Sequence, residues 1–380
     1  MAQVLEMKRA LVIHPRMSVY GGGELVCLHT IRALQDIDYE VSLFCDSIDV
    51  QRIELQFGMG EAVKRSRHIP LFAGDIEAFS GDSTSPRFAT LNTLRRLNYA
   101  KKTIQRLQER IPDVVFQTQP SVHFLPGSRS FEFIYQPNDI DGSDFYHMGY
   151  RLPDENWKHT YFAIIRRYRD LIIERPPRRQ LLALSRNLVD HLRARGYDSS
   201  LVFPPCRQFK TLTKMKQVVT IARIDPVKRL EVFCDVARNL PECRFVIVGT
   251  ESTFHPGYKA SLLSKAPPNV KYVESPISLR PELLGESKVY LHTSKQRGLA
   301  IALAEGLSAG CMPVCYSGGD GVEVIRESGI GFIFESTEQA TEEVKEALNM
   351  SSPTPEEISA RSYIFSPQIF ERKIQSLVER

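Results

Sequence analysis

Short apolar runs rich in β-branched and aromatic residues alternate along the chain with segments of helical periodicity, and this alternation occurs twice. Such runs, bounded by turn residues, are typical of buried strands. In the first half of the chain the predicted strands are 9–14, 39–46, 113–119, 131–136 and 181–185. In the second half they are 217–223, 244–249, 269–274, 288–293 and 312–317.

Segments with helical periodicity lie between the predicted strands. The predicted helices are 24–35, 87–110, 156–174, 228–239, 257–266, 280–287, 300–309, 337–349 and 366–380. Alternation of strands and helices favours parallel sheets with right-handed crossovers. The sequence therefore predicts an α/β protein with two doubly wound domains. The boundary is expected near 203–216, where a double proline precedes a polar, basic segment.

The composition is that of a globular protein. The chain has 380 residues, 42% of them hydrophobic, which is enough for two domains of ordinary size. Its apolar runs are shorter than the roughly 20 residues that span a bilayer, and the first residues lack a signal-peptide pattern. Seven cysteines without a C-x-x-C pair favour packed thiols in a reducing cytoplasm over disulfides. Cys311 and Cys315 lack a second ligand pair, so no metal site is predicted. We expect a cytoplasmic protein, with peripheral attachment to a membrane as an open alternative.

The positive charge lies in the first half of the chain. Residues 1–210 contain 29 Lys and Arg against 24 Asp and Glu, whereas the remainder contains 20 against 21. This bias suits anionic lipid or phosphate partners. The basic segments lack the dense stripe with interleaved aromatics that is typical of nucleic-acid binding, so no nucleic-acid partner is expected.

Ligands of parallel sheets bind at the carboxyl ends of the strands, so the loops at those ends hold the candidate site. The loop 14–24 contains three consecutive glycines before a helix. Gly22 and Gly23 permit close backbone approach to an anion at the helix N-terminus. A tight strand-to-helix turn without a ligand is the alternative.

The loop 222–229 carries two cations. Arg223 ends a strand and Lys228 precedes a helix, and a guanidinium and an ammonium placed in this way can converge on a diphosphate. An exposed basic loop with no ligand is the alternative.

A third candidate lies in the stretch SKQRGLAIALAEGLSAG, 294–310. The predicted helix 300–309 can receive phosphate oxygens at its N-terminus. Glu305 can accept two hydrogen bonds from a ribose diol, or it can pair with a backbone group or an arginine. Gly318 and Gly319 precede a further helix end that is suited to an anion.

Other polar features are more ambiguous. His123 follows the strand 113–119 and faces the predicted cleft either as a catalytic group or as a structural histidine. The acidic loop 136–145 lacks the spacing of a calcium loop, which favours acceptor contact or loop capping. The basic helices 90–110 and 156–174 fit core packing or lodging at a membrane surface.

Taken together, these stretches resemble the retaining glycosyltransferases of family 4, over most of the chain. Within that family the chain is most similar to the α-1,2-mannosyltransferases that extend the dolichol-linked oligosaccharide. The fragments that carry this likeness are IHPRMSVYGGGE, IRALQ, FPPC and YLHTS.

The resemblance implies the GT-B fold, with two facing Rossmann-like domains. It implies an acceptor-binding domain at 1–205 and a donor-binding domain at 206–362. A C-terminal helix, 363–380, is expected to cross back to the first domain. The expected partners are a nucleotide-sugar donor and a glycan or lipid-linked acceptor. The donor is expected to be GDP- or UDP-linked, and GDP-mannose is the first candidate. The resemblance also implies that no metal or other cofactor is needed, and that the sugar is transferred with retention.

The same resemblance assigns roles to individual residues. Arg223 and Lys228 would neutralise the donor diphosphate, Glu305 would bind the nucleotide ribose, and Gly22 and Gly23 would line the cleft.

The chain departs from the family at one motif. The family has two glutamates separated by seven residues, and Arg297 stands in place of the first. An arginine cannot accept the hydrogen bonds of a donor sugar. Arg297, with Gly298, Leu299 and Ala300, is therefore expected to face the diphosphate or an anionic sugar, or else to bind no part of the donor. A nucleotide-sugar epimerase or phosphorylase, or a non-catalytic binding subunit, are the alternative functions.

Overall fold

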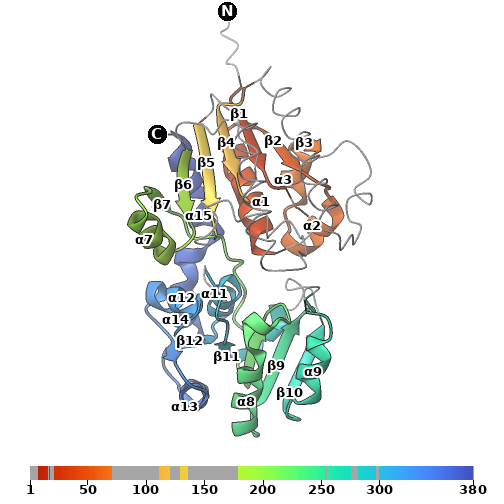
Figure 1. The fold of residues 1–380 in the computed structure, drawn as a ribbon, viewed down its shortest axis with the longest axis vertical. Coiled ribbons are helices and arrows are strands. Elements are labelled where there is room, and N and C mark those ends of the chain that lie inside the picture. Colours follow the sequence, from red (N-terminus) through yellow and green to blue (C-terminus); the bar gives the residue numbers. More distant parts are fainter. Residues whose placement is uncertain are drawn as a thin grey trace, which may run out of the picture. The chain divides into compact units, whose positions relative to one another are not determined.

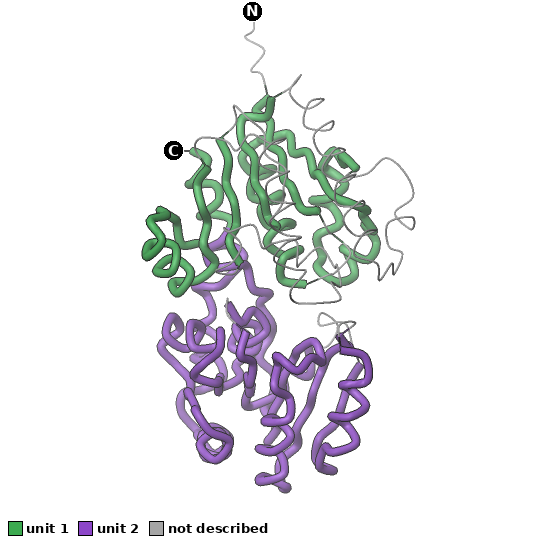
Figure 2. The backbone as a smooth tube through the Cα atoms, in the orientation of Figure 1, with its two compact units in different colours: residues 1–202, 371–380 green, residues 203–370 purple. Residues whose placement is uncertain are grey.

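The computed structural model describes residues 7–15, 17, 21–70, 111–119, 129–135, 179–252, 255–274, 281–296 and 299–379. The chain divides into two compact units (Figure 2). Unit 1 comprises residues 1–202 and 371–380, and unit 2 comprises residues 203–370.

Unit 1 is built on a seven-stranded parallel sheet (Figure 1). Its strands are β1 (Arg9–Ile13), β2 (Glu40–Cys45), β3 (Arg67–Pro70), β4 (Val114–Gln117), β5 (Arg129–Ile134), β6 (Arg179–Ala183) and β7 (Ser199–Leu201). They lie in the order β3-β2-β1-β4-β5-β6-β7, so the direction of strand addition reverses between β1 and β4. This is a doubly wound arrangement, as the sequence predicts.

The described helices of unit 1 are α1 (Gly22–Gln35), α2 (Val50–Phe57), α3 (Gly60–Lys64), α7 (Arg186–Ala194) and the last turns of α15 (Pro367–Glu379). Helix α1 is buried along almost its whole length from Glu24 onward, which accounts for its apolar sequence. It begins at Gly22, two residues before the predicted start, and the Glu24 carboxylate accepts a hydrogen bond from the Gly21 amide at 2.7 Å.

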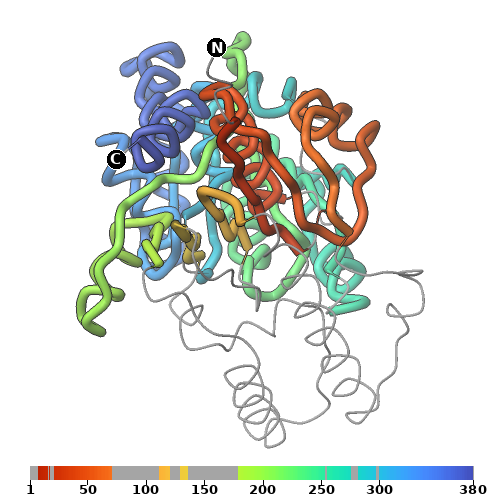
Figure 3. The backbone as a smooth tube through the Cα atoms, turned by 90° about the horizontal axis from the view of Figure 1, so that it is seen from above, coloured from red at the N-terminus to blue at the C-terminus, as the bar shows by residue number. Residues whose placement is uncertain are grey.

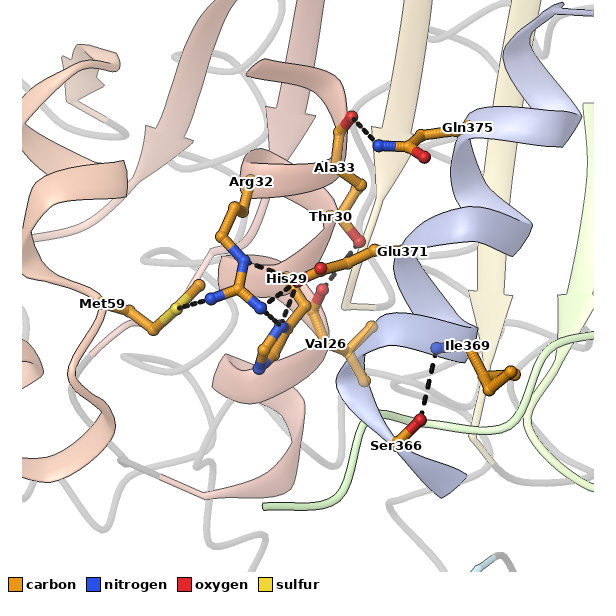
Figure 4. Close-up of polar contacts among 10 residues, drawn as sticks. All are labelled: Val26, His29, Thr30, Arg32, Ala33, Met59, Ser366, Ile369, Glu371 and Gln375. Carbon is orange, nitrogen blue, oxygen red and sulfur yellow. Dashed lines mark hydrogen bonds and ion pairs between the residues drawn. The ribbon is translucent and has the colours of Figure 1, made fainter. Parts of the chain in front are cut away.

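Helix α15 is anchored to α1 by a polar cluster (Figure 4). His29 Nδ1 and Arg32 Nε lie 2.6 and 2.7 Å from the same Glu371 oxygen, and Gln375 donates to the Ala33 carbonyl at 3.2 Å. Arg32 also contacts the Met59 sulfur at 3.3 Å. The two helices lie side by side, as Figure 3 shows from a second direction. The last residues of the chain are therefore an integral part of unit 1.

Unit 2 has a six-stranded parallel sheet with the order β10-β9-β8-β11-β12-β13. Its strands are β8 (Met215–Ile221), β9 (Arg244–Gly249), β10 (Val270–Glu274), β11 (Ser287–His292), β12 (Met312–Tyr316) and β13 (Phe332–Phe334). Its helices are η3 (Pro226–Lys228), α8 (Leu230–Asn239), α9 (Tyr258–Ser264), α10 (Pro281–Glu286), α11 (Ile301–Ser308), α12 (Gly321–Ser328), α13 (Thr337–Asn349), α14 (Pro355–Ala360) and η4 (Arg361–Phe365).

The ten predicted strands are all present, and the prediction of two doubly wound parallel sheets is confirmed. The pattern missed β3, β7 and β13, which are edge strands of three or four residues. β3 (RHIP) and β7 (SSL) carry polar residues, and β13 (FIF) is apolar but only three residues long, too short to stand out as a strand. The predicted helix 228–239 is interrupted at Arg229, which has φ 51° and separates η3 from α8. Helices 87–110 and 156–174 lie outside the described residues.

Candidate functional site

The candidate site of unit 2 lies where its strand order reverses. Strands β9 and β10 extend the sheet on one side of β8, and β11, β12 and β13 extend it on the other. The connections after β8 and β11 therefore leave toward opposite faces of the sheet, which is the position at which doubly wound sheets bind their ligands. Residues 222–229 follow β8 and residues 293–300 follow β11.

Asp225 organises the loop after β8. Its Oδ1 accepts a hydrogen bond from the Val227 amide at 3.1 Å, and its Oδ2 lies 3.4 Å from Arg223 Nε and 3.2 Å from His255 Nδ1. Burial would raise the pKa of Asp225, but hydrogen bonds from Ser252 and Val227 and the Arg223 charge bring that pKa below its usual value. The guanidinium of Arg223 is thereby held at one end while its side chain remains 47% exposed. It can present its other N–H groups to an anion.

Lys228 is attached to the loop after β11. Its ammonium donates to Gln296 Oε1 at 2.7 Å, and its carbonyl accepts from Thr293 Oγ1 at 2.6 Å. A further bond runs from the Lys295 amide to the Val227 carbonyl at 3.1 Å. The structure thus brings the two loops of the switch point together, with Arg223 and Lys228 in the first of them.

The glycines of the SGG segment are required by close packing. A Cβ atom on Gly319 would lie 2.1 Å from the Ser294 carbonyl oxygen, and one on Gly318 would lie 2.6 Å from the Tyr316 ring. The guanidinium of Arg229 lies over the same ring, 4.1 Å from its centroid. Gly319 therefore lets the loop after β12 approach the loop after β11, and Gly318 lets it pack against the Tyr316 ring.

Glu305 has a protein partner in the structure. Arg207 donates from Nε and Nη2 to the two carboxylate oxygens at 2.7 and 3.1 Å, and the Glu305 side chain is 1% exposed. The sequence allowed Glu305 either to bind a ribose diol or to pair with a protein group such as an arginine. The structure shows the pairing with an arginine. Helix α11 lies close to the sheet here, because Gly306 faces the Tyr290 ring. Leu299 and Ala300 precede α11, where Ala300 provides no capping side chain.

Two site residues escaped the sequence analysis. His292 at the end of β11 and Asp320 before α12 are buried, and their Nε2 and Oδ1 atoms are 2.7 Å apart. Each could have been noticed as a polar residue in an apolar setting, within YLHTS and SGGDG. Their pairing could not, because it depends on the adjacency of β11 and β12.

The remaining candidates lie elsewhere. Gly22 and Gly23 form the first turn of α1 in unit 1, and a Cβ on Gly23 would lie 3.7 Å from the buried His14 ring. His123, Arg297, Gly298 and the acidic loop 136–145 lie outside the described residues. The predicted site residues that lie in the described segments after the carboxyl ends of β8, β11 and β12 are Arg223, Lys228, Leu299, Ala300, Gly318 and Gly319.

Two further observations concern the described part of the chain. Nowhere in the described ranges do three or more His, Cys, Asp or Glu side chains gather in a group that could hold a metal ion. Among the helices that the structure describes, none is both long enough and apolar enough to cross a bilayer.

Residues 207–364 match the protein-family model for glycosyl transferases group 1. Unit 2 is therefore similar to this family over nearly its whole length. The domain's β8, β11 and β12 loops are those that assemble the candidate site. No curated protein matches the chain.

Solved structures show the same fold over nearly all of the chain. Anabaena Alr3699/HepE in complex with UDP and glucose has a TM-score of 0.68 at 14% identity, covering 98% of this chain and 100% of its own. A glycosyltransferase from Rickettsia africae has a TM-score of 0.65 at 12% identity, with 98% of both chains covered. WaaG, a glycosyltransferase involved in lipopolysaccharide biosynthesis, has a TM-score of 0.63 at 13% identity, covering 97% and 98%. The fold is thus that of the GT-B glycosyltransferases, and together with the group 1 domain it supports a glycosyltransferase.

Proposed function

We propose that the protein is a retaining glycosyltransferase that moves a hexose from a nucleoside diphosphate to a glycan or lipid-linked oligosaccharide. The observation that carries the proposal is the placement of Arg223 and Lys228 at the switch point of a group 1 domain. A diphosphate leaving group gains negative charge as the glycosidic bond breaks, and fixed cations stabilise that charge.

The two cations have different parts in this mechanism. Arg223, held by Asp225 and half exposed, offers a planar fork to the phosphate oxygens, and Lys228 supplies a compact charge. The acceptor hydroxyl attacks the anomeric carbon on the same face from which the leaving group departs. The β-phosphate takes the proton of that hydroxyl. Since the two side chains neutralise the phosphates, we propose that the reaction needs no metal or other cofactor.

The donor is proposed on two grounds. Resemblance to the α-1,2-mannosyltransferases makes GDP-mannose the first candidate. Two similar structures, HepE and TarM from S. aureus, are described with UDP. UDP-hexoses are therefore the second group of candidate donors. Unit 1, with Gly22 and Gly23, would bind the acceptor, and its basic character suits peripheral contact with an anionic membrane in the cytoplasm.

The decisive experiment is a screen of GDP- and UDP-linked sugars for slow hydrolysis, combined with calorimetry of GDP and UDP binding. Arg223→Ala and Lys228→Met should each lower turnover of the preferred donor by about 10²- to 10³-fold. Arg238→Ala is the matched control, because Arg238 lies on the exposed surface of α8 and pairs with Asp235. The absence of binding to both nucleotides would refute the proposal. The anomeric configuration of the product, measured by NMR, tests retention.

A non-catalytic binding subunit is the second candidate. It is favoured by the pairing of Glu305 with Arg207, and by Arg297 in place of the family's first glutamate. Nucleotide binding with no hydrolysis or transfer from any donor would support this candidate. Isomerised sugar recovered in the absence of acceptor would instead indicate an epimerase.

A further inference from the structure

A cavity of about 200 Å³ lies at the edge of the unit 2 sheet that is opposite the candidate site. It is lined by residues at the amino ends of β8, β11 and β12, namely Lys214, Lys288 and Met312, and by residues that follow α13 and begin α14. In a parallel sheet all strands begin at one edge and end at the other, so this cavity is separate from the loops that follow β8, β11 and β12.

Two ammonium groups in this cavity are bound by carbonyl groups of the backbone. Lys288 donates to the Met350 carbonyl at 2.7 Å, and Lys214 donates to the Ala309 carbonyl at 2.6 Å. A longer contact of 3.5 Å joins Lys214 to the Leu284 carbonyl. Among the described residues, no carboxylate lies within ion-pair distance of either ammonium group. An ammonium has three N–H donors, so Lys288 keeps two of them for a ligand.

The backbone partners of the two lysines offset only part of their charge. Ala309 is the C-cap residue of α11, and Met350 is that of α13. A helix C-terminus carries about half a negative charge, so the two helix ends offset about one of the two positive charges. Two more distant charges, Lys216 and Glu356, have opposite signs and each act on one of the lysines. The cavity therefore keeps about one positive charge, which suits a singly charged anion.

The other groups that line the cavity are mainly apolar. They include Met312, Met350, Pro353 and Ile358. A volume of this size has room for about six to eight non-hydrogen atoms. The ligand that fits both the charge and the lining has one anionic head group and a short apolar chain.

We propose that this cavity binds a small monocarboxylate, whose carboxylate contacts the ammonium groups of Lys214 and Lys288 and whose apolar chain packs against Met312 and Met350. A carboxylate accepts charge-assisted hydrogen bonds from both lysines and neutralises the charge that the helix ends leave. The inference does not depend on the proposed glycosyl transfer, because the cavity shares no residue with the candidate site.

The test is an NMR titration of the protein, isotope-labelled at its methionine methyl groups, with butyrate, acetate, inorganic phosphate and butanol at constant ionic strength. Met312→Leu and Met350→Leu assign the two methyl signals of the cavity. The titrations are repeated with Lys288→Gln and Lys214→Gln. Lys345→Gln is the matched control, because Lys345 is exposed on α13 and does not line the cavity. Thermal unfolding verifies that each variant is folded.

We expect butyrate to shift both methyl signals with a dissociation constant of about 1–10 mM, which is reasonable for so small a ligand. Acetate lacks two methylene groups and should bind about tenfold more weakly. Butanol lacks the charge and should also bind about tenfold more weakly. Lys288→Gln and Lys214→Gln should each weaken butyrate binding about tenfold, whereas Lys345→Gln should bind it as the wild type does.

Three results would overturn the proposal: butyrate shifts neither signal, butanol binds as well as butyrate, or both cavity variants bind butyrate as the wild type does. In each case the two lysines serve only the helix ends. Tighter binding of inorganic phosphate than of butyrate would overturn the choice of a monocarboxylate.

Discussion

The backbone of Gly319 touches that of Ser294, so closely that a Cβ atom on the glycine would lie 2.1 Å from the Ser294 carbonyl oxygen. Backbone cannot yield as a side chain can, so Gly319→Ala must displace the loop after β12 from the loop after β11. We expect it to destabilise unit 2 by about 1–3 kcal/mol and to weaken nucleotide binding at least tenfold. Urea unfolding and calorimetry measure the two effects.

Gly329→Ala is the matched control for this substitution. Gly329 has φ 69° but no atom within 4 Å of its Cβ position, and it ends α12. Its substitution should cost about 1–2 kcal/mol through backbone strain alone and leave nucleotide affinity unchanged. Equal losses of affinity in the two variants would show that close packing at Gly319 does not shape the site.

Arg207 and Glu305 should prove to be strongly coupled. Arg207→Met leaves a carboxylate that is 1% exposed without its partner, which typically costs about 3–5 kcal/mol of unfolding free energy. The double variant Arg207→Met, Glu305→Leu should recover most of that loss, because it removes the stranded charge. A cost below about 1 kcal/mol in the single variant would show that the pair stabilises little. Glu305 would then be free to serve a ribose.

Unit 1 should lose stability as the pH falls below about 6.5. Burial and the Arg32 charge lower the pKa of His29, although its hydrogen bond to Glu371 acts in the opposite direction. The unfolded chain therefore takes up a proton at pH values where folded His29 remains neutral. The unfolding free energy should fall by up to about 1.4 kcal/mol per pH unit in this range.

His29→Asn tests this dependence, because its amide can donate to Glu371 in place of Nδ1 and does not titrate. The fall in thermal stability between pH 6.5 and 5 should be shallower in this variant. His68→Asn, at an exposed position on β3, is the control and should follow the wild type. An unchanged slope in His29→Asn would contradict the assignment.

Tyr290 should stabilise the end of β8. Its hydroxyl accepts from the Ile221 amide and donates to the Ile221 carbonyl, both at 3.0 Å, and its side chain is fully buried. Tyr290→Phe leaves the two backbone groups without this partner, which should cost about 1–3 kcal/mol in urea unfolding. Tyr258→Phe, which removes an exposed bond to Glu231, should change stability by less than about 0.5 kcal/mol. Similar small effects in both variants would argue against this role.

Sequence patterns located much of the fold and part of the site. Central strands of a parallel sheet are buried on both faces, so β1, β8 and β11 are visible as apolar runs. The basic loop with Arg223 and Lys228 was found because it directly follows such a strand. The edge strands β3, β7 and β13 were missed, since β3 and β7 contain polar residues and β13, although apolar, is only three residues long.

The sequence by itself determined that two strand-and-helix series are present, where their central strands lie, and which loops carry cations and glycines, because these are properties of neighbouring residues. Tertiary structure alone decided which of these groups meet. Glu305 takes Arg207, 98 residues away, and His292 takes Asp320, 28 residues away. Such pairs depend on strand order and on crossovers that bring distant loops to one edge of a sheet, and no local periodicity records that order.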